Sequence, residues 1–436
     1  MVICDKYDGK NIIIYGLGKS GLSTYEALKE TSANLFLWDD DVLIRDKLTK
    51  KGIIFSNDND WPWNKMDFLI PSPGIQVSNK NKSPIIKKSL ENNKIKIIGD
   101  FEIFFQNHKN NKSKDKIITV TGTNGKSTFV SILKDILETD GRNVSLAGNI
   151  GVPILSQKES NQERIYIFEV SSFQIELFNE FRSDIAVLLN ISNDHADRYN
   201  SFDEYKKTKL KIFSNLESDD FAILNNSLSY KNSISKINPL PEKVIINNEE
   251  FFNNNSFDLP NFSYKELIPA LFAVTDILNI SQDKAIKALL NFKNLEHRTN
   301  KIHSKDNIIF IDDSKATNPA AANYAISKFT DIYWILGGLS KGNDLSKLQL
   351  GSKNIKKAFF IGSSSYELEK IAPDQLEYEL SKDLERATKS AYNDAKINKR
   401  GVILLSPGCS SLDQYKDFNE RGEAFIKAVN NLVKEC

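Results

Sequence analysis

Short runs of aliphatic and β-branched residues recur along this chain, and most are followed by a stretch with the 3.6-residue apolar spacing of an amphipathic helix. Runs of this kind, bounded by polar turn residues, are typical of strands buried on both faces of a parallel sheet. They fall into three groups. The predicted strands are Asn11–Tyr15, Leu35–Trp38, Phe68–Ile70 and Ile95–Ile98, then Ile117–Val120, Ile165–Val170, Ile185–Asn190 and Ala222–Asn225, then Ile308–Asp312, Ile332–Leu336, Ala358–Ile361 and Val402–Leu405.

The three groups of strands predict three α/β domains, because strands that alternate with helices build parallel sheets. Boundaries near residues 100 and 299 give domains of residues 1–100, 101–299 and 300–436. We expect a Rossmann-like N-terminal domain, a central domain of the phosphate-loop type with a mostly parallel sheet, and a Rossmann-like C-terminal domain. The polar stretch Ser227–Ser256 is predicted to be loop with irregular strands, and helices are predicted at Tyr264–Leu278 and Gln282–Leu290.

Composition narrows the classes of partner. Lys and Arg number 58 against 57 Asp and Glu, so the chain lacks the basic excess that favours nucleic-acid binding. No apolar run approaches the roughly 18 residues of a membrane span, and the N-terminus does not have the pattern of a signal peptide. Cys4, Cys409 and Cys436 are far apart in sequence. We expect a cytoplasmic protein without disulfides or structural zinc.

The segment Ile117–Thr128, which reads IITVTGTNGKST, has the layout of a phosphate-binding loop between a buried strand and a helix. Glycines let the backbone N–H groups of Gly122–Gly125 close around an anion, and the helix N-terminus adds a partial positive charge. In such a loop Lys126 reaches the β- and γ-phosphates, and Ser127 places a hydroxyl on Mg²⁺. The standard pattern has glycine where this chain has Val120, so the loop is a shortened variant.

A second glycine-rich turn, Gly16-Leu-Gly18-Lys-Ser20-Gly21, follows the first predicted strand and satisfies the dinucleotide fingerprint. Asp39 closes the next strand, where a ribose-binding carboxylate belongs, and Ser72-Pro73-Gly74 closes the third. Taken alone, this turn indicates NAD about as strongly as it indicates an ordinary strand–helix connection. Because the chain also has the Gly122–Ser127 loop, two phosphorylated ligands explain both turns without redox chemistry.

Other polar groups follow later strands, at the edge where ligands bind in open α/β sheets. Glu169 ends a buried strand beside hydroxyls, which suits Mg²⁺, although a lone strand-end glutamate is more often a surface residue. His195 lies between two aspartates just after a strand, and Lys209 lies on an amphipathic helix where spacing alone would not single it out. Three polar strand ends of the C-terminal third suit a small carboxylate substrate. They are Asp312–Pro319, Leu336–Gly342 and Leu405–Phe418.

Together these motifs resemble the Mur ligases of peptidoglycan synthesis. The segments that carry the resemblance are GTNGKST at 122–128, the strand end at Glu169, NISNDHADRY at 190–199 and HR at 297–298. The segments DDSKATN, LGGLSKG and SPGCSSLDQYKDF are similar to those of the members that add D-glutamate to UDP-N-acetylmuramoyl-L-alanine. The resemblance implies that a substrate carboxylate attacks the γ-phosphate of ATP, and that the amine of D-glutamate then attacks the acyl phosphate.

The resemblance also implies an ATP site, two Mg²⁺ sites and a carbamylated lysine. The implied ATP-binding residues are Gly122, Thr123, Asn124, Gly125, Lys126, Ser127, Thr128, Arg298 and Asp313. The implied catalytic residues are Lys126, Glu169, His195 and Lys209, and the implied metal ligands are Ser127, Glu169, His195 and Lys209. A free lysine, with a pKa of ~10.4, would repel Mg²⁺, whereas its carbamate presents anionic oxygens.

Two substrate sites follow from the resemblance in the same way. The residues implied for UDP-N-acetylmuramoyl-L-alanine are Gly16, Gly18, Ser20, Gly21, Asp39, Ser72, Pro73, Gly74, Asn149 and His195. The residues implied for D-glutamate are Lys315, Thr317, Lys341, Ser411, Leu412 and Phe418. We expect a cytoplasmic monomer that binds no nucleic acid and is not inserted in a membrane.

Three alternatives remain open on the sequence. Another amino-acid ligase of the group, including one like folylpolyglutamate synthetase, would usually lack the DDSKATN segment. A nucleotide-binding module without catalysis is disfavoured because Lys126, Glu169, His195 and Lys209 are all present. An NAD-dependent dehydrogenase built on the Gly16 turn would leave the second phosphate loop unexplained.

Overall fold

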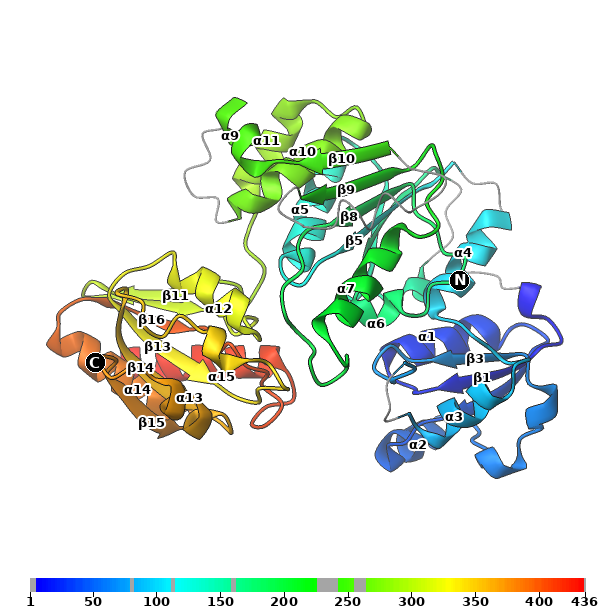
Figure 1. Ribbon diagram of the computed structural model, residues 1–436, viewed down its shortest axis with the longest axis horizontal. Helices are drawn as coiled ribbons and strands as arrows, with labels where there is room; N and C mark the ends of the chain where they lie inside the picture. Colours follow the sequence, from blue (N-terminus) through cyan, green and yellow to red (C-terminus); the bar gives the residue numbers. More distant parts are fainter. Residues whose placement is uncertain are drawn as a thin grey trace. The chain divides into compact units, whose positions relative to one another are not determined.

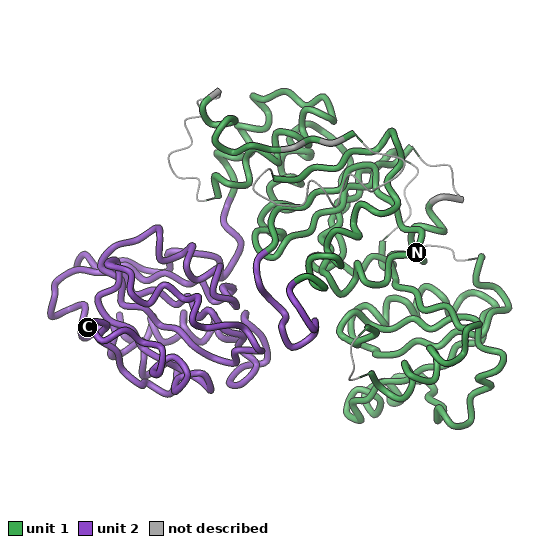
Figure 2. The backbone as a smooth tube through the Cα atoms, viewed as in Figure 1, with its two compact units in different colours: residues 1–191, 203–292 green, residues 192–202, 293–436 purple. Residues whose placement is uncertain are grey.

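The computed structural model of the chain describes residues 5–78, 82–110, 114–157, 162–225, 242–254 and 264–434. Contacts divide the chain into two compact units, one of residues 1–191 and 203–292 and the other of residues 192–202 and 293–436 (Figure 2). The first unit holds two sheets and the second holds one, and helices connect most of the strands (Figure 1). The predicted α/β class with mostly parallel sheets is therefore confirmed.

The N-terminal sheet of the first unit is parallel throughout, in the order β2-β1-β3-β4. Its strands are β1 (Asn11–Tyr15), β2 (Asn34–Trp38), β3 (Phe68–Pro71) and β4 (Lys96–Ile97), and the helices along it are α1 (Lys19–Leu28), α2 (Val42–Thr49) and α3 (Pro84–Glu91). Ile12, Ile13 and Ile14 of β1 are fully buried, as expected for a strand covered on both faces.

The middle sheet of the first unit is also parallel, in the order β10-β9-β8-β5-β7-β6. Its strands are β5 (Lys116–Thr121), β6 (Val144–Gly148), β7 (Ile165–Glu169), β8 (Ile185–Leu188), β9 (Phe221–Asn225) and β10 (Glu242–Ile246). The helices are α4 (Asp100–Asn110), α5 (Lys126–Thr139), α6 (Ser172–Ile175), α7 (Phe202–Leu210), α9 (Asn248–Asn254), α10 (Ile268–Ile277) and α11 (Gln282–Asn291). Because β5 pairs with β8 and β7, the loop after β5 is flanked by the carboxyl ends of both.

The sheet of the second unit has the order β11-β12-β16-β13-β14-β15, and β11 is its antiparallel strand. Its strands are β11 (Asn300–Lys305), β12 (Ile308–Asp312), β13 (Ile332–Gly337), β14 (Ile355–Ile361), β15 (Tyr378–Lys382) and β16 (Gly401–Leu405). Its helices are α12 (Pro319–Ile326), α13 (Ser365–Ile371), α14 (Leu384–Ile397) and α15 (Phe418–Lys434). Apolar residues on the two faces form two separate core clusters.

The predicted strands all appear, but four strands of the structure were not predicted. These are β6, β10, β11 and β15, and each lies at the edge of its sheet. Edge strands are partly exposed and therefore more polar, as the sequence NKIHSK of β11 shows, so they lack the continuous apolar run of a central strand. For Ser227–Ser256 the expectation was loop with irregular strands; in its described part Glu242–Ile246 is a strand, whereas the helix Asn248–Asn254 was not predicted. Residues 226–241 and 255–263 lie outside the described residues.

The remaining elements are short. The 3₁₀ helices are η1 (Asp5–Tyr7), η2 (Asp58–Asp60), η3 (Trp63–Lys65), η4 (Ile154–Ser156), η5 (Lys211–Phe213), η6 (Lys265–Leu267) and η7 (Leu345–Lys347). Within the described ranges, no helix is both long and apolar enough to cross a membrane. Cys409 is a buried free thiol, whereas Cys4 and Cys436 lie outside the described residues.

Candidate active site

The phosphate loop connects β5 to α5, as the sequence predicted. Gly125 precedes α5 at φ +83°, a left-handed conformation that favours glycine. A Cβ on Gly122 would lie 3.1 Å from the Cβ of Leu189, so the loop passes close to the segment after β8. Lys126 Nζ donates to the carbonyl oxygens of Gly122 (2.8 Å) and Thr123 (3.0 Å), so the lysine side chain folds back over its own loop.

Asn190, at the end of the β8 segment, holds this loop through its side chain. Its Oδ1 accepts from the backbone N–H of Thr123 (3.1 Å) and of Asn124 (2.9 Å), and its Nδ2 donates to the carbonyl oxygen of Asn124 (3.0 Å). The site residues predicted from the sequence did not include Asn190. Its sequence signals were its position directly after a buried strand that neighbours β5 and its place as the first residue of the NISNDHADRY segment.

Glu169 ends β7, which is the other neighbour of β5. Its side chain is 1% exposed; Oε1 accepts from Nδ2 of Asn149 at 2.8 Å, and Oε2 is buried without a hydrogen-bond partner. Thr128 Oγ1, in the first turn of α5, is also buried and unpartnered. Buried oxygens without partners normally cost stability.

These oxygens fit a Mg²⁺ site. Mg²⁺ prefers oxygen ligands and is usually held by one or two carboxylates together with phosphates and water. Among the described residues, no cluster of three or more His, Cys, Asp or Glu side chains could hold a metal. Glu169 and the hydroxyls at the start of α5 are therefore suitable donors, once a nucleotide supplies phosphate oxygens.

Lys209 lies at the end of α7 with only 2% of its surface exposed. Its Nζ donates to the carbonyl oxygen of Gly122 (2.9 Å) and contacts Thr121 Oγ1 at 3.4 Å. The Tyr205 ring lies 5.0 Å from this nitrogen, and the Tyr205 hydroxyl is 3.1 Å from Thr123 Oγ1. Lys126 and Lys209 therefore converge on one carbonyl oxygen of the phosphate loop, which amphipathic spacing could not have predicted.

The N-terminal glycine turn is tightly packed. Gly16 has φ +85°, a Cβ on Gly21 would lie 1.8 Å from the carbonyl oxygen of Gly16, and Ser72 Oγ donates to that oxygen at 2.7 Å. The structure thus brings the predicted residues Gly16, Gly21 and Ser72 together, with Gly18 preceding α1 and Pro73 and Gly74 following Ser72. Two other predicted residues already have protein partners. Asp39 accepts from the N–H of Leu17 (2.6 Å) and of Asp41 (2.9 Å), and Ser20 donates to Asp100.

His195 belongs to the second compact unit, with residues 192–202. Its φ is +54°, its side chain is 37% exposed, and its Nε2 lies 3.8 Å from Asp194 Oδ2. Asn318 Nδ2 donates to the same Asp194 oxygen at 3.2 Å. A Cβ on Gly342 would lie 3.4 Å from Ala196, so the segment with Lys341 passes beside this loop.

Asp313 is the carboxyl group of the second unit whose pKa is shifted most. Burial raises its pKa to about 7, although Thr299 donates to it from N–H (3.1 Å) and Oγ1 (3.2 Å) and Ser406 Oγ donates at 2.8 Å. The neighbouring Asp312 accepts from the His297 ring at 2.6 Å, and this hydrogen bond raises the pKa of His297. Arg298 lies between His297 and Thr299, at the entry to β11.

The predicted D-glutamate residues lie on loops at the carboxyl ends of β12, β13 and β16. Lys315 Nζ sits 4.0 Å from the centre of the Phe418 ring, so two of the predicted residues are in contact. Ser411 is buried, Leu412 is exposed, and Thr317 is partly buried.

Arg421 in α15 ties two of these loops together and was also missed from the sequence. It is 1% exposed and donates to the carbonyl oxygens of Cys409 (3.1 Å) and Ser314 (2.8 Å) and to Ser314 Oγ (3.1 Å). Burial lowers its pKa to about 10. An arginine on a helix normally predicts a solvated side chain, so only the fold could reveal this role.

Comparisons with known proteins agree with this architecture. The Mur ligase middle domain family matches residues 120–266, which include the phosphate loop, Glu169 and Lys209. Among solved structures, a MurC ligase of Thermotoga maritima aligns with a TM-score of 0.57 at 16% identity, over 97% of this chain and 99% of that chain. A MurF ligase of Thermotoga maritima in complex with ADP has a TM-score of 0.59 at 17% identity, over 85% and 99%. These two show the shared fold.

Sequence relatives extend over almost the whole chain. A protein named UDP-N-acetylmuramoylalanine--D-glutamate ligase from Rickettsia prowazekii is 35% identical over 97% of this chain and 98% of its own length. Proteins of the same name are 36% identical in Rickettsia bellii, over 97% and 98%, and 31% identical in Caulobacter vibrioides, over 98% and 97%. By these full-length matches, the chain belongs to the UDP-N-acetylmuramoylalanine--D-glutamate ligase family of the Mur ligases.

Proposed function

We propose that this chain joins D-glutamate to UDP-N-acetylmuramoyl-L-alanine in an ATP-dependent reaction that releases ADP and phosphate, as a step of peptidoglycan precursor synthesis. The observation that carries the proposal is the phosphate loop with Lys126 after β5, together with the buried Glu169 at the end of the neighbouring strand β7, whose Oε2 has no partner. Such a pair suits phosphoryl transfer, in which positioning and charge neutralisation matter more than a protein nucleophile.

The reaction has two steps. A carboxylate oxygen of the alanyl substrate attacks the γ-phosphorus, so the acyl phosphate forms and the bond to ADP breaks. The amine of D-glutamate then attacks the acyl carbon, loses a proton, and displaces phosphate to form the amide. Lys126 is the residue that would neutralise the transferred phosphoryl group, the backbone N–H groups at the start of α5 would hold the phosphates, and residues Gly122–Gly125 would form the loop around them.

The metal and carbamate assignments are further parts of the proposal. Ser127 and Glu169 would hold one Mg²⁺, with Thr128 at the phosphates, while His195 and carbamylated Lys209 would serve a second Mg²⁺. When bound, Mg²⁺ supplies charge neutralisation to the phosphate oxygens. The buried position of Lys209 beside the loop, with its Nζ 2.9 Å from the Gly122 oxygen, supports the carbamate, because an anionic side chain there would complement a metal.

The substrate sites follow the position-by-position resemblance. We propose that the Gly16–Gly21 turn, Asp39, Ser72–Gly74, Asn149 and His195 bind the UDP-linked substrate, and that Arg298 and Asp313 contact ATP. The residues proposed for D-glutamate are Lys315, Thr317, Lys341, Ser411, Leu412 and Phe418. The contact between Lys315 and Phe418 supports a cationic pocket with one apolar wall.

The proposed organisation is three domains, of residues 1–100, 101–299 and 300–436, one for each sheet. We also propose that the protein is cytoplasmic, since both substrates are charged metabolites of the cell interior. We propose in addition that it is a monomer. Light scattering on a size-exclusion column tests the monomer, and a dimer mass would overturn it.

The decisive experiment is a phosphate-release assay with ATP, Mg²⁺, UDP-N-acetylmuramoyl-L-alanine and a panel of D- and L-amino acids. We expect turnover with D-glutamate alone. Turnover with another amino acid would favour a different ligase of the group, and ATP binding without any turnover would favour a nucleotide-binding module.

Lys209→Ala tests the carbamate separately. We expect it to lose most activity and bicarbonate not to restore it, because no amine remains to be modified. Carbon-13 NMR of the wild-type enzyme in labelled bicarbonate should show a carbamate signal that Lys209→Ala lacks. A fully active variant would contradict the assignment.

A further inference from the structure

The phosphate loop lacks the first glycine of the standard pattern, so contacts from elsewhere in the fold must hold its shape. Val120, at that position, is a fully buried residue of β5. The loop has to turn within Gly122–Gly125, and two of its residues, Thr123 and Asn124, are not glycine. Backbone groups in such a turn need hydrogen-bond partners from elsewhere in the fold.

Asn190 supplies those partners. The Thr123 N–H donates both to the backbone oxygen of Asn190 (3.0 Å) and to its Oδ1 (3.1 Å). The same Oδ1 accepts from Asn124 N–H at 2.9 Å, and Nδ2 returns a bond to the Asn124 oxygen at 3.0 Å. The Asn190 side chain thus accepts through Oδ1 from Thr123 and Asn124 and donates through Nδ2 to Asn124.

These bonds decide which loop groups can face an anion. The N–H groups of Thr123 and Asn124 point to Asn190, whereas the N–H groups that open any α-helix have no acceptor within the helix. The anion-binding groups of this loop are therefore those at the start of α5, together with Lys126. Asn190 is neutral, so it fixes the loop without placing a negative charge beside the phosphates.

We propose that Asn190 is a positioning residue for nucleotide binding, which holds the phosphate loop in the shape that receives the β- and γ-phosphates. The inference rests on the proposed function, since it needs this loop to hold the phosphates of ATP. It adds a residue from the β8 segment, 66 positions from Asn124 in sequence, to the nucleotide site.

The test measures equilibrium binding of ADP and AMP, each with Mg²⁺, to the full-length protein and its variants. Asn190→Ala should weaken ADP binding about 10- to 100-fold, because part of the binding free energy is then used to order the loop. AMP binding should change less, since AMP lacks the β-phosphate. In turnover, the KM for ATP should rise while the KM for D-glutamate stays within about threefold.

Asn190→Asp tests whether this side chain lies beside the phosphates in a protein that keeps both acceptor bonds to the loop. Aspartate keeps the acceptor for both N–H groups but loses the donor to Asn124 and faces the phosphates with a negative charge. We expect it to keep more of the wild-type thermal stability than Asn190→Ala and still to bind ADP poorly. If Asn190→Ala does not fold, Asn190→Asp provides the binding test.

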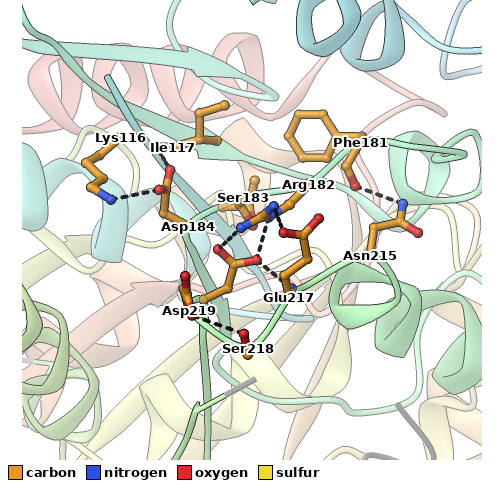
Figure 3. Close-up of polar contacts among 12 residues, drawn as sticks. Lys116, Ile117, Phe181, Arg182, Ser183, Asp184, Asn215, Glu217, Ser218 and Asp219 are labelled. Atoms are coloured by element: carbon orange, nitrogen blue, oxygen red, sulfur yellow. Dashed lines mark hydrogen bonds and ion pairs between the residues drawn. The ribbon is translucent and has the colours of Figure 1, made fainter. Parts of the chain in front are cut away.

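Asn215→Ala is the matched control. Its amide also donates to backbone oxygens, of Asn179 (2.7 Å) and of Phe181 (3.0 Å; Figure 3), which precede β8, whereas the phosphate loop follows β5. ADP affinity should be unchanged in this variant. Wild-type affinity for ADP in both Asn190 variants would overturn the inference, whereas a wild-type protein that bound no ADP would instead overturn the proposed function.

Discussion

The buried carboxylates at the two ends of the middle sheet differ in how fully they are hydrogen-bonded. At the amino ends of β5 and β8, Arg182 holds Asp220 through two hydrogen bonds of 2.6 and 3.0 Å, and the N–H of Glu217 donates to Asp220 at 2.7 Å (Figure 3). Asp184 pairs with Lys116 at 2.9 Å and accepts from the N–H of Ile117 at 2.8 Å.

At the carboxyl ends of the same sheet, the polar groups are only partly satisfied. Glu169 is 1% exposed and Asp220 is 2% exposed, so the two carboxylates are equally buried. Asp220 is bonded at both oxygens, whereas Glu169 has one neutral amide partner and one oxygen with none. Lys126 and Lys209 both donate to the Gly122 oxygen.

The difference separates groups that stabilise the fold from groups that await a ligand. A buried oxygen without a hydrogen-bond partner lowers the free energy of unfolding. A folded protein keeps such an oxygen where a ligand provides the missing partner. The carboxyl end has the proposed nucleotide site, and the hydrogen bonds at the amino end hold the strands in place. Changes at the two ends should therefore alter different measured quantities.

Glu169→Gln should give the largest effect. It removes the charge at the proposed Mg²⁺ site but keeps the shape, so kcat should fall by about 100-fold or more. The free energy of unfolding should be unchanged or higher, because a neutral amide costs less to bury than a carboxylate. Phosphate release over a Mg²⁺ titration and urea unfolding measure the two effects. A destabilised but active variant would contradict the contrast between the ends.

Asp220→Asn is the matched change at the amino end. It leaves Arg182, which is 30% exposed, with Glu217 as its remaining charged partner, and the free energy of unfolding should fall by about 2 kcal/mol, less than for a fully buried pair. Below the unfolding transition, kcat and the KM for ATP should stay within about twofold of wild type. Loss of turnover at unchanged stability would show that this end also takes part in catalysis.

Asp313 in the second unit is an intermediate case, since it is buried and hydrogen-bonded but only by neutral groups. Its folded pKa of about 7 lies above the unfolded value near 3.8, so between these values the folded state keeps a proton that the unfolded state releases. This group's contribution to stability is present below about pH 4 and is lost as pH rises to about 7.

Asp313→Asn should therefore remove part of the pH dependence of stability. The wild type should lose up to about 1.4 kcal/mol per pH unit more than the variant between pH 5 and pH 7. Urea unfolding at several pH values measures this difference. Because both proteins contain His297, its contribution to the pH dependence cancels in the comparison. Parallel curves for the two proteins would contradict the raised pKa.

Lys116→Ala should give the smallest effect. The lysine side chain is 51% exposed and its partner Asp184 31% exposed, so the pair should contribute no more than about 0.5 kcal/mol. Thermal unfolding at low and high salt should detect a small loss that salt abolishes. A loss above about 2 kcal/mol would mean that the amino-end network is more cooperative than its exposure indicates.

The sequence was a good guide where structure depends on local pattern. The predicted central strands and both glycine turns appear, because residues buried on two faces form continuous apolar runs and tight turns need glycine. Edge strands such as β11 and β15 were missed because their exposed positions break that run. The site residues remain predictions, and the geometry adds Asn190 and Arg421, which no spacing rule singled out.

The sequence by itself determined the fold class, the order of strands and loops, and the chemical groups offered at each strand end. Only the tertiary structure decided which of those groups are satisfied and which are not. Thr123 and Asn190 are 67 positions apart, and Arg182 and Asp220 are 38 apart. Hydrogen bonding between such residues depends on how the strands pair, so only the folded protein shows that Asp220 is bonded at both oxygens and Glu169 at one.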